Sequence, residues 1–319
     1  LGSGPVLEAQ DSSFYRGVIQ WLIAHPAQDP GYLLKASEHP DDAEAARLKT
    51  SSCDVRASKV CAGNWVGGYR LTADYYRGDR AMRESGFDTN FHFGPFGGST
   101  HHYAGVGLNS LLYRYELDLR DFARKLGKTA DAQRWEAAAA ARKAAMDKYL
   151  WQPKPGMYRD YDFVAGKPSD APYLTTFYPL WAGAASPAQA RAVRDQLAVF
   201  ELPGGLSMDN RPSEVQWDAP FGWAPTNWLA IAGLDAYGFH DDARRLAGKF
   251  TATVDRSLAE DGTIREKYNM ALGNADVKVS AGYSANVIGF GWTNGVYLKL
   301  RQLLDGTAGK DAARPAPLH

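Results

Sequence analysis

The sequence predicts an all-α fold built from helical hairpins. Segments with apolar residues at helical spacing recur along the 319 residues, whereas alternating β-branched strand patterns are almost absent. Short links such as 127–129 alternate with long connections rich in glycine, proline and aromatic residues. Such hairpins, with functional loops gathered at one end, suit an α/α toroid in which six hairpins surround a funnel. About nine helices are expected where a complete ring needs about twelve, so the toroid is predicted to be incomplete.

The helices are predicted in chain order from their apolar periodicity and end signals. Ser12 and Ser13 provide a cap for the first helix, whose apolar residues fall on one face: Phe14, Val18, Trp21 and Leu22. Segment 64–83 repeats this pattern. The clearest segment, 108–126, carries a stripe typical of a face that packs on a core: Leu111, Leu112, Tyr115, Leu119, Phe122 and Leu126. Gly127 ends this helix, and the alanine-rich segment 131–150 follows. Later helices are expected at 171–184, 186–200, 225–237, 241–258 and 294–304.

The composition limits the kind of partner. The 36 basic residues balance the 36 acidic ones, which argues against a nucleic-acid or anionic-membrane partner, because such partners need a basic surface. The charge-free stretches 171–190 and 279–298 contain prolines or glycines, so neither predicts a membrane span. Aromatic residues make up 12% of the chain, which fits either a surface that stacks on sugar rings or a large aromatic core.

The two cysteines, Cys53 and Cys61, have no matching cluster of His or Cys, so no zinc site is expected there. One local disulfide, which would imply an oxidising compartment, and two free thiols are both compatible with the sequence. The opening residues 1–5 lack a methionine and a basic start, which is typical of a processed chain with natural sequence upstream.

Four loop segments stand out. Segments 84–88, 216–225 and 265–269 combine a carboxylate with aromatic residues or glycine, and 289–295 combines aromatic residues with glycines. A carboxylate in aromatic surroundings can act as a proton donor, because desolvation raises its pKa. Glycines beside it let the backbone approach a ligand closely. These residues by themselves fit either a hydrolase with a carboxylate pair or loops that pack through salt bridges.

Two of these strings, QWDAPFGWAP at 216–225 and GFGWTNG at 289–295, resemble two diagnostic stretches of the trehalases, the inverting hydrolases of α,α-trehalose. Segments 84–88 and 266–268 resemble those that hold the family's two catalytic carboxylates. All four occur in the family's order. The resemblance implies an (α/α)6 toroid, no cofactor, and hydrolysis of the disaccharide to two glucose molecules.

The resemblance implies that Asp88 is the general acid and Glu266 the general base. An inverting mechanism needs one protonated and one ionised carboxyl group, about 6.5–9.5 Å apart, with room for a water molecule. Because Asp88 and Glu266 are far apart in the sequence, only a closed tertiary fold can bring them this close together. The alternative for Asp88 is a helix cap or an ion pair with Arg83, and for Glu266 an exposed pair with Lys267.

The same resemblance implies a set of substrate-binding residues: Gly86, Gln216, Trp217, Asp218, Trp223, Trp292 and Arg70. Gly86 would place its backbone against a sugar hydroxyl, and Asp218 either lines the pocket or braces its loop. Trp292 either lines one side of the site or anchors the last helix. Arg70 matches the family's sugar-gripping arginine, whose planar fork can donate to two hydroxyls.

A metal site is not predicted. His101 and His102 suggest one, but the sequence shows no third ligand at a useful spacing, so packing of their loop is expected. The chain also departs from the family pattern. The Pro-Gly-Gly-Arg signature and the Arg-Pro-Glu-Ser string are absent, and the glycine-rich loop that ends in glutamate reads Ser-Ala-Gly-Tyr at 280–283. These departures leave the preferred disaccharide open.

The predicted organisation is one toroidal glycosidase domain over 1–305, without the family's N-terminal part, followed by a flexible tail over 306–319. The predicted activity is trehalose hydrolysis. The alternatives are a non-catalytic half-toroid that binds a sugar or a partner, and a related toroidal α-glycosidase with another disaccharide substrate. A separate N-terminal segment that docks to complete the ring is a further expected partner. The cysteine pair favours a periplasmic or secreted location over the cytoplasm.

Overall fold

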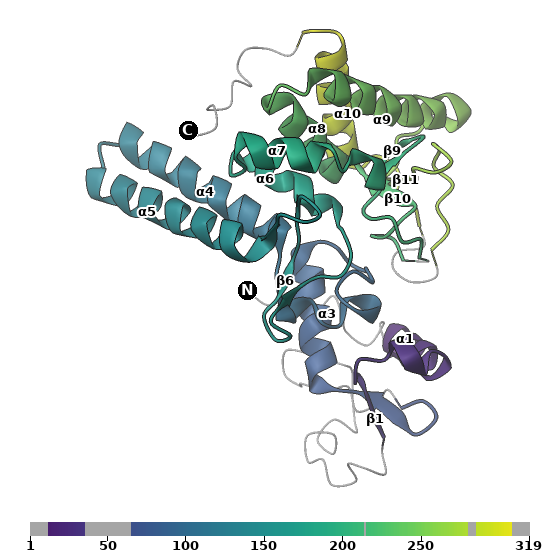
Figure 1. The fold of residues 1–319 in the computed structure, drawn as a ribbon. Coiled ribbons are helices and arrows are strands. Elements are labelled where there is room, and N and C mark those ends of the chain that lie inside the picture. Colours follow the sequence, from purple (N-terminus) through teal and green to yellow (C-terminus); the bar gives the residue numbers. More distant parts are fainter. Residues whose placement is uncertain (1–11, 36–64, 214, 280–284, 308–319) are drawn as a thin grey trace. The chain divides into compact units, whose positions relative to one another are not determined.

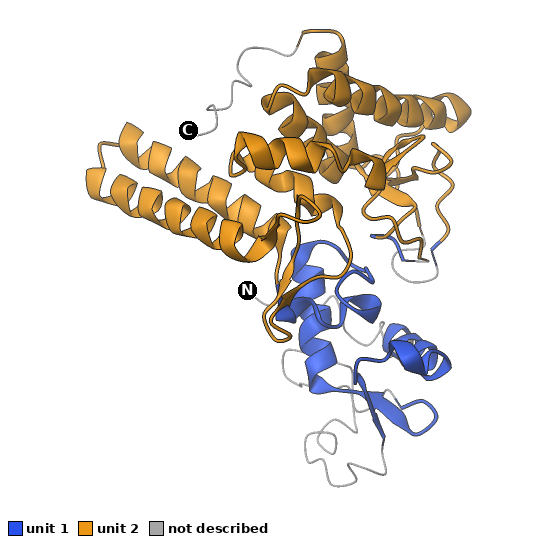
Figure 2. Ribbon diagram, viewed as in Figure 1, with its two compact units in different colours: residues 1–103, 215–217, 279–282 blue, residues 104–214, 218–278, 283–319 orange. Residues whose placement is uncertain are grey.

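A computed structural model describes residues 12–35, 65–213, 215–279 and 285–307 (Figure 1). The chain divides into two compact units (Figure 2). Unit 1 comprises 1–103, 215–217 and 279–282, and unit 2 comprises 104–214, 218–278 and 283–319. The single domain over 1–305 stays a prediction. The two cysteines and most of the predicted tail lie outside the described residues.

Unit 1 contains helices α1 (Ser12–Ala24) and α3 (Ala73–Ser85). Strand β1 (Leu33–Lys35) pairs antiparallel with β2 (Tyr69–Leu71). The helix predicted over 64–83 is therefore wrong in its first half. Thr72 caps α3, because its side chain accepts a hydrogen bond from the Tyr75 amide at 3.1 Å, and the residues before it pair with a distant strand instead.

The core of unit 1 forms where α1 packs on α3 and β2. Tyr15, Val18 and Leu22 of α1 are buried against Leu71 and Tyr75. The rings of Tyr15 and Tyr75 meet edge to face, with centroids 6.4 Å apart. This confirms the apolar face predicted for the first helix.

Unit 2 holds the remaining described helices: α4 (Val106–Lys125), α5 (Thr129–Ala145), α6 (Tyr178–Ala182), α7 (Pro187–Arg194), α8 (Ala224–Ala236), α9 (His240–Asp261) and α10 (Gly291–Leu304). All lie within or close to predicted segments. Helices α4 and α5 form a hairpin whose link contains Gly127 at φ +69°. A π-helical turn, Met146–Leu150, extends α5, and α8 packs on α6, α9 and α10.

The chain is mostly helical, as predicted, but short strands also occur. The further strands are β3 (Tyr103–Ala104), β4 (Trp151–Gln152), β5 (Met157–Tyr158), β6 (Tyr161–Asp162), β7 (Lys167–Pro168), β8 (Glu201–Leu202), β9 (Gly205–Leu206), β10 (Phe221–Trp223) and β11 (Lys267–Asn269). Each has two or three residues, too few for the sequence periodicity to reveal. The pairing of β10 with β11 matters most, because it joins two of the predicted functional loops.

The predicted packing face of α4 is wrong. Leu111, Tyr115 and Phe122 are 45%, 59% and 57% exposed. The buried face instead includes Tyr113, Leu117 and the charged Glu116, which receives hydrogen bonds of 2.8–3.0 Å from Arg142 of α5. This ion pair and the contact with α6 select a face that apolar periodicity alone does not favour.

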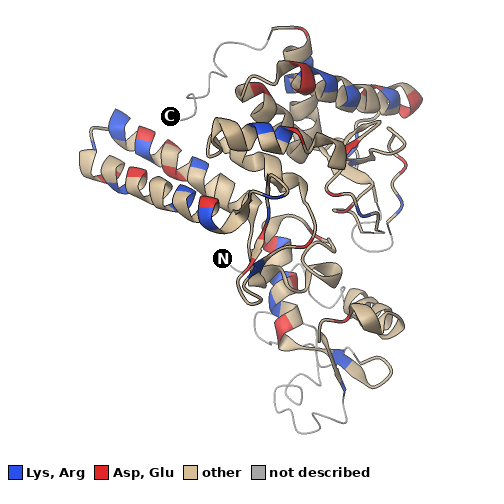
Figure 3. Ribbon diagram, viewed as in Figure 1, with Lys and Arg blue, Asp and Glu red and all other residues tan. Residues whose placement is uncertain are grey.

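Charged side chains of both signs interleave along α4, α5 and α9, so neither sign dominates these helices (Figure 3). No helix in the described ranges combines the length and apolar character needed to cross a bilayer.

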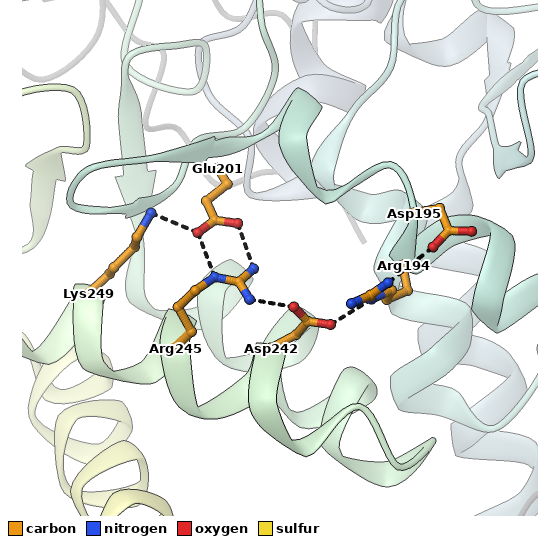
Figure 4. Close-up of polar contacts among 6 residues, drawn as sticks. All are labelled: Arg194, Asp195, Glu201, Asp242, Arg245 and Lys249. Carbon is orange, nitrogen blue, oxygen red and sulfur yellow. Dashed lines mark hydrogen bonds and ion pairs between the residues drawn. The ribbon is translucent and has the colours of Figure 1, made fainter.

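A charged network ties α7, α9 and β8 together in unit 2 (Figure 4). Arg245 donates to both carboxylate oxygens of Glu201, at 3.0 and 2.8 Å, and also contacts Asp242. Arg194 donates to Asp242 at 2.6 Å, and Lys249 lies 2.7 Å from Glu201. Arg245 bridges two carboxylates with its planar fork and so holds β8 to the first turns of α9. Arg194 holds the end of α7 to the same turns through Asp242.

Candidate active site

The predicted site residues fall into two groups, one in each unit. Unit 1 holds Arg70, Gly86, Asp88, Gln216 and Trp217. Unit 2 holds Asp218, Trp223, Glu266 and Trp292. The predicted acid and base therefore belong to different units, and their approach to each other stays a prediction.

The loop that carries Asp88 begins where α3 ends. Gly86 stops the helix in the left-handed conformation, at φ +83°, which glycine adopts without steric cost. No heavy atom lies within 4 Å of the position that a Cβ on Gly86 would take, so its backbone is open to a ligand. Asp88 is half-buried two residues beyond this cap and caps neither end of α3. The Nε of Arg83 donates to Asp79 at 3.2 Å.

The segment 215–217 holds the backbone around Asp88. The side-chain amide of Gln216 donates to the carbonyl oxygen of Asp88, and the Trp217 amide donates to the Thr89 carbonyl at 3.1 Å. The Trp217 ring meets Phe87 edge to face at 5.1 Å. Gln216 and Trp217 are almost fully buried. The structure thus brings together three of the predicted site residues, Asp88, Gln216 and Trp217.

Arg70 lies on β2 and is fully buried. Its guanidinium carbon lies 5.3 Å from the centre of the Trp65 ring, which is a cation–π distance. A strand pair, rather than the predicted helix, therefore fixes this arginine.

Glu266 is fixed by main-chain contacts in unit 2. Its amide donates to the Val287 carbonyl at 2.9 Å, and its carbonyl accepts a hydrogen bond from the Thr293 hydroxyl at 3.4 Å. Glu266 is 7% exposed, and the fully buried Lys267 places its ammonium 3.1 Å from the carboxylate. The pair with Lys267 is therefore buried, not the exposed pair considered as the alternative.

Aromatic rings surround this ion pair. Trp223 of β10 lies opposite Lys267 of β11, with the ammonium nitrogen 5.3 Å from the ring centre. Trp292 meets Trp223 edge to face at 5.9 Å and Phe290 at 4.6 Å. Trp292 stands in the first turn of α10 and is 37% exposed, so both roles considered for it stay open.

Asp218 accepts a hydrogen bond from the Ser213 hydroxyl at 2.7 Å and is almost fully buried. This contact is the one expected of a residue that braces its loop.

The sequence interpretation named Lys267 only as an exposed partner of Glu266, and it missed Thr293. Recognition that strand β11 pairs with β10 would have placed the lysine beside Trp223.

Burial and nearby charges set the ionisation of groups next to both carboxylates. Burial raises the pKa of the Tyr268 hydroxyl, which accepts a hydrogen bond from the Arg265 amide at 2.9 Å. Burial alone would lower the pKa of the Arg83 guanidinium, but the charge of Asp79, its hydrogen bond to Arg83 and further nearby groups together outweigh burial and raise that pKa. Tyr268 therefore stays protonated and Arg83 stays charged at neutral pH.

The two adjacent histidines of unit 1 have a partner that their sequence spacing does not reveal. The Nε2 atoms of His101 and His102 lie 3.0 and 3.1 Å from the two carboxylate oxygens of Asp74. Burial lowers the pKa of His101 even though Asp74 opposes that shift, which favours the neutral imidazole at neutral pH. The expectation that no third potential ligand accompanies this pair is wrong, because α3 supplies Asp74.

A cavity of about 320 Å³ opens in unit 2, lined by residues that include Met146, Tyr149, Tyr161 and Phe163. None of the predicted site residues lines it, and its lining carries no carboxylate. It is therefore not a candidate for hydrolysis by a carboxylate pair.

The comparisons with known proteins agree on one family. The sequence model of the trehalase family matches residues 70–305. The cytosolic neutral trehalases of Neurospora crassa and Kluyveromyces lactis are 34% and 35% identical to the chain, over 73% and 70% of its length. These matches cover 36% and 33% of the two relatives, so the chain spans about a third of their length.

Two solved structures are also similar. Neutral trehalase Nth1 from Saccharomyces cerevisiae matches 74% of this chain and 44% of its own, with a TM-score of 0.62 and 31% identity. A GH63 mannosylglycerate hydrolase from Thermus thermophilus matches 61% of this chain and 45% of its own, with a TM-score of 0.51 and 24% identity, and supports the fold alone. With a family match over most of its length and relatives at this identity, the chain belongs to the trehalase family.

Proposed function

We propose that this chain carries the acid–base machinery of a trehalase, which hydrolyses α,α-trehalose to two glucose molecules with inversion at one anomeric carbon. The observation that carries the proposal is the setting of Glu266. Within the region matched by the family, this carboxylate is 7% exposed and paired with a buried lysine, whose ammonium lies over the Trp223 ring. The relatives named above are trehalases, which supports the same substrate.

In the proposed reaction, Asp88 protonates the bridging oxygen while Glu266 takes a proton from the attacking water. The bond from the anomeric carbon to the bridging oxygen breaks as the water oxygen bonds to that carbon. An ion pair with Lys267 suits the charged form that a base must have. The mechanism requires the two carboxyl groups about 6.5–9.5 Å apart.

Each of these two groups has proposed binding residues within its own unit. Gly86 offers an open backbone beside the acid, and Trp292 offers an exposed aromatic edge beside the base. Gln216, Trp217 and Asp218 hold the loops that carry the site.

The proposed complete fold is an (α/α)6 toroid to which this chain contributes part of the ring. The exposed face of α4, which presents Leu111, Tyr115 and Phe122 to solvent, supports this proposal. A contiguous apolar face of this kind marks a contact surface. We propose that the family's N-terminal part, present in relatives more than twice as long as this chain, packs on it.

We also propose a cytoplasmic location. The relatives named above are cytosolic trehalases, which supports this alternative and gives no support to the periplasmic expectation.

Proton NMR of freshly formed product tests the activity and the mechanism together. The expected result is one α- and one β-glucose per trehalose. Asp88→Asn and Glu266→Gln are each expected to lower kcat by at least about 10²-fold, the range of general acid–base contributions. Asp241→Asn and Glu260→Gln, matched changes at exposed carboxylates of α9, are the controls.

Other outcomes identify the alternatives. Trehalose binding without turnover would favour the non-catalytic half-toroid, and turnover of a different disaccharide would favour the related α-glycosidase. Retention of configuration at both anomeric carbons would refute the assignment of Asp88 and Glu266 as acid and base.

A further inference from the structure

We infer that Asp74, His101 and His102 form a binding site for a divalent transition-metal ion, and that the site prefers Zn²⁺. None of these residues has a role in the proposed hydrolysis. The inference rests on the geometry of unit 1 and is independent of the proposed function.

Two local elements bring the three side chains together. Asp74 lies in the first turn of α3, and the histidines lie in the 3-10 turn Thr100–His102, which packs on that helix. The candidate donor atoms all lie within 4.8 Å of one another, and the Nε2 atoms of the two histidines lie 3.0 and 3.1 Å from the carboxylate oxygens of Asp74. A tetrahedral zinc ion with bonds of about 2.0 Å needs donor atoms about 3.3 Å apart, so the cluster is already close to this spacing.

The donor set matches zinc better than calcium or magnesium. Two imidazole nitrogens and one carboxylate oxygen are typical zinc ligands, whereas calcium and magnesium prefer sites made of oxygen atoms. When the ion binds, each histidine donates its Nε2 lone pair and carries its proton on Nδ1. Three protein ligands leave a fourth position for water.

The site is open to an ion from solvent. The side chains of His101, His102 and Asp74 are 21%, 23% and 44% exposed. The guanidinium of Arg77 lies 3.3 Å from an Asp74 oxygen, and its positive charge opposes a cation there. We therefore expect removal of the Arg77 charge to strengthen metal binding.

Calorimetric titration of the full chain with ZnCl₂ tests the inference. The titration uses a Cys53→Ser/Cys61→Ser background, because cysteine thiolates also bind zinc. The expected result is one ion per chain. His102→Gln and Asp74→Asn should each weaken binding at least tenfold, and Arg77→Gln should tighten it several-fold.

His240→Gln is the matched control. His240 pairs with Asp235 at 2.7 Å through a single imidazole and belongs to unit 2, so its loss should leave zinc affinity unchanged. The absorption spectrum of bound Co²⁺ gives a second readout, since a tetrahedral nitrogen and oxygen site produces visible bands that His102→Gln should abolish. Circular dichroism of each variant verifies that the chain is folded.

Absence of zinc binding in the cysteine-free chain would overturn the inference. So would binding that His102→Gln leaves unchanged in a folded chain, or that His240→Gln weakens equally. Because every readout is binding, a chain that binds zinc but does not hydrolyse trehalose would refute the proposed function alone.

Discussion

Replacement of Gly78 by alanine should destabilise this protein, although alanine normally stabilises a helix interior. Gly78 lies inside α3, where alanine would be favoured by about 1 kcal/mol on helix propensity alone. However, a Cβ at this position would lie 1.7 Å from the carbonyl oxygen of Gly98 and 2.2 Å from its carbonyl carbon. Both contacts are with backbone, which cannot rotate away as a side chain can.

The structure gives the size of the effect. Contacts of a Cβ under 3.0 Å are essentially never observed, so α3 and the Gly98 backbone would have to separate by at least about 1.3 Å. Overpacking of this kind costs about 1–3 kcal/mol and sometimes more. We expect Gly78→Ala to lower the free energy of unfolding by about 2 kcal/mol or more, and to loosen the helix that leads to Asp88.

Gly17 provides a control within the same unit. It lies inside α1, and a Cβ there would have no heavy atom within 4 Å. Gly17→Ala should therefore raise the free energy of unfolding by about 0.5–1 kcal/mol. Urea unfolding, combined with hydrogen exchange of the α3 amides, measures both changes. If Gly78→Ala stabilised the chain as much as Gly17→Ala, the close approach of α3 to Gly98 would be wrong.

Three further changes test contacts in unit 2. Lys267→Met should lower the free energy of unfolding by about 3 kcal/mol, because it leaves the buried Glu266 carboxylate without its ion-pair partner. Adding Glu266→Gln to this variant should restore most of the lost stability. Urea unfolding of the two single variants and the double variant measures both effects. Hydrogen bonds from Arg245 hold the pKa of Glu201 below its ordinary value, so the pair stabilises the folded chain above about pH 4.3 and loses this contribution as the pH falls through the lowered pKa. In unfolding curves measured at successive pH values, the free energy of unfolding of Glu201→Gln should fall less steeply with decreasing pH than that of the unchanged chain. An equally steep fall in the two proteins would contradict this. Ser186→Ala removes the capping box of α7 and should cost about 1 kcal/mol, seen as a lower midpoint of thermal unfolding.

The features that depend on local interactions were predictable from the amino-acid sequence. Helices over 12–24, 106–125, 129–145 and 240–261 follow the predicted segments because apolar periodicity and end signals act within a few turns. Gly127 and Gly86 end their helices because their left-handed conformations are a property of single residues. The family was also predictable from sequence, since its motif strings are contiguous in the chain.

Which surfaces and side chains contact each other depends on tertiary packing and could not be predicted from local sequence. On α4 it buried the face that pairs Glu116 with Arg142 and left the more apolar stripe exposed, because partners select the packing face and periodicity does not. It also buried Lys267 beside Glu266, and it brought Asp74 to a pair of histidines 27 and 28 positions away. Such contacts depend on the closure of long loops, and no local preference of the residues encodes that closure.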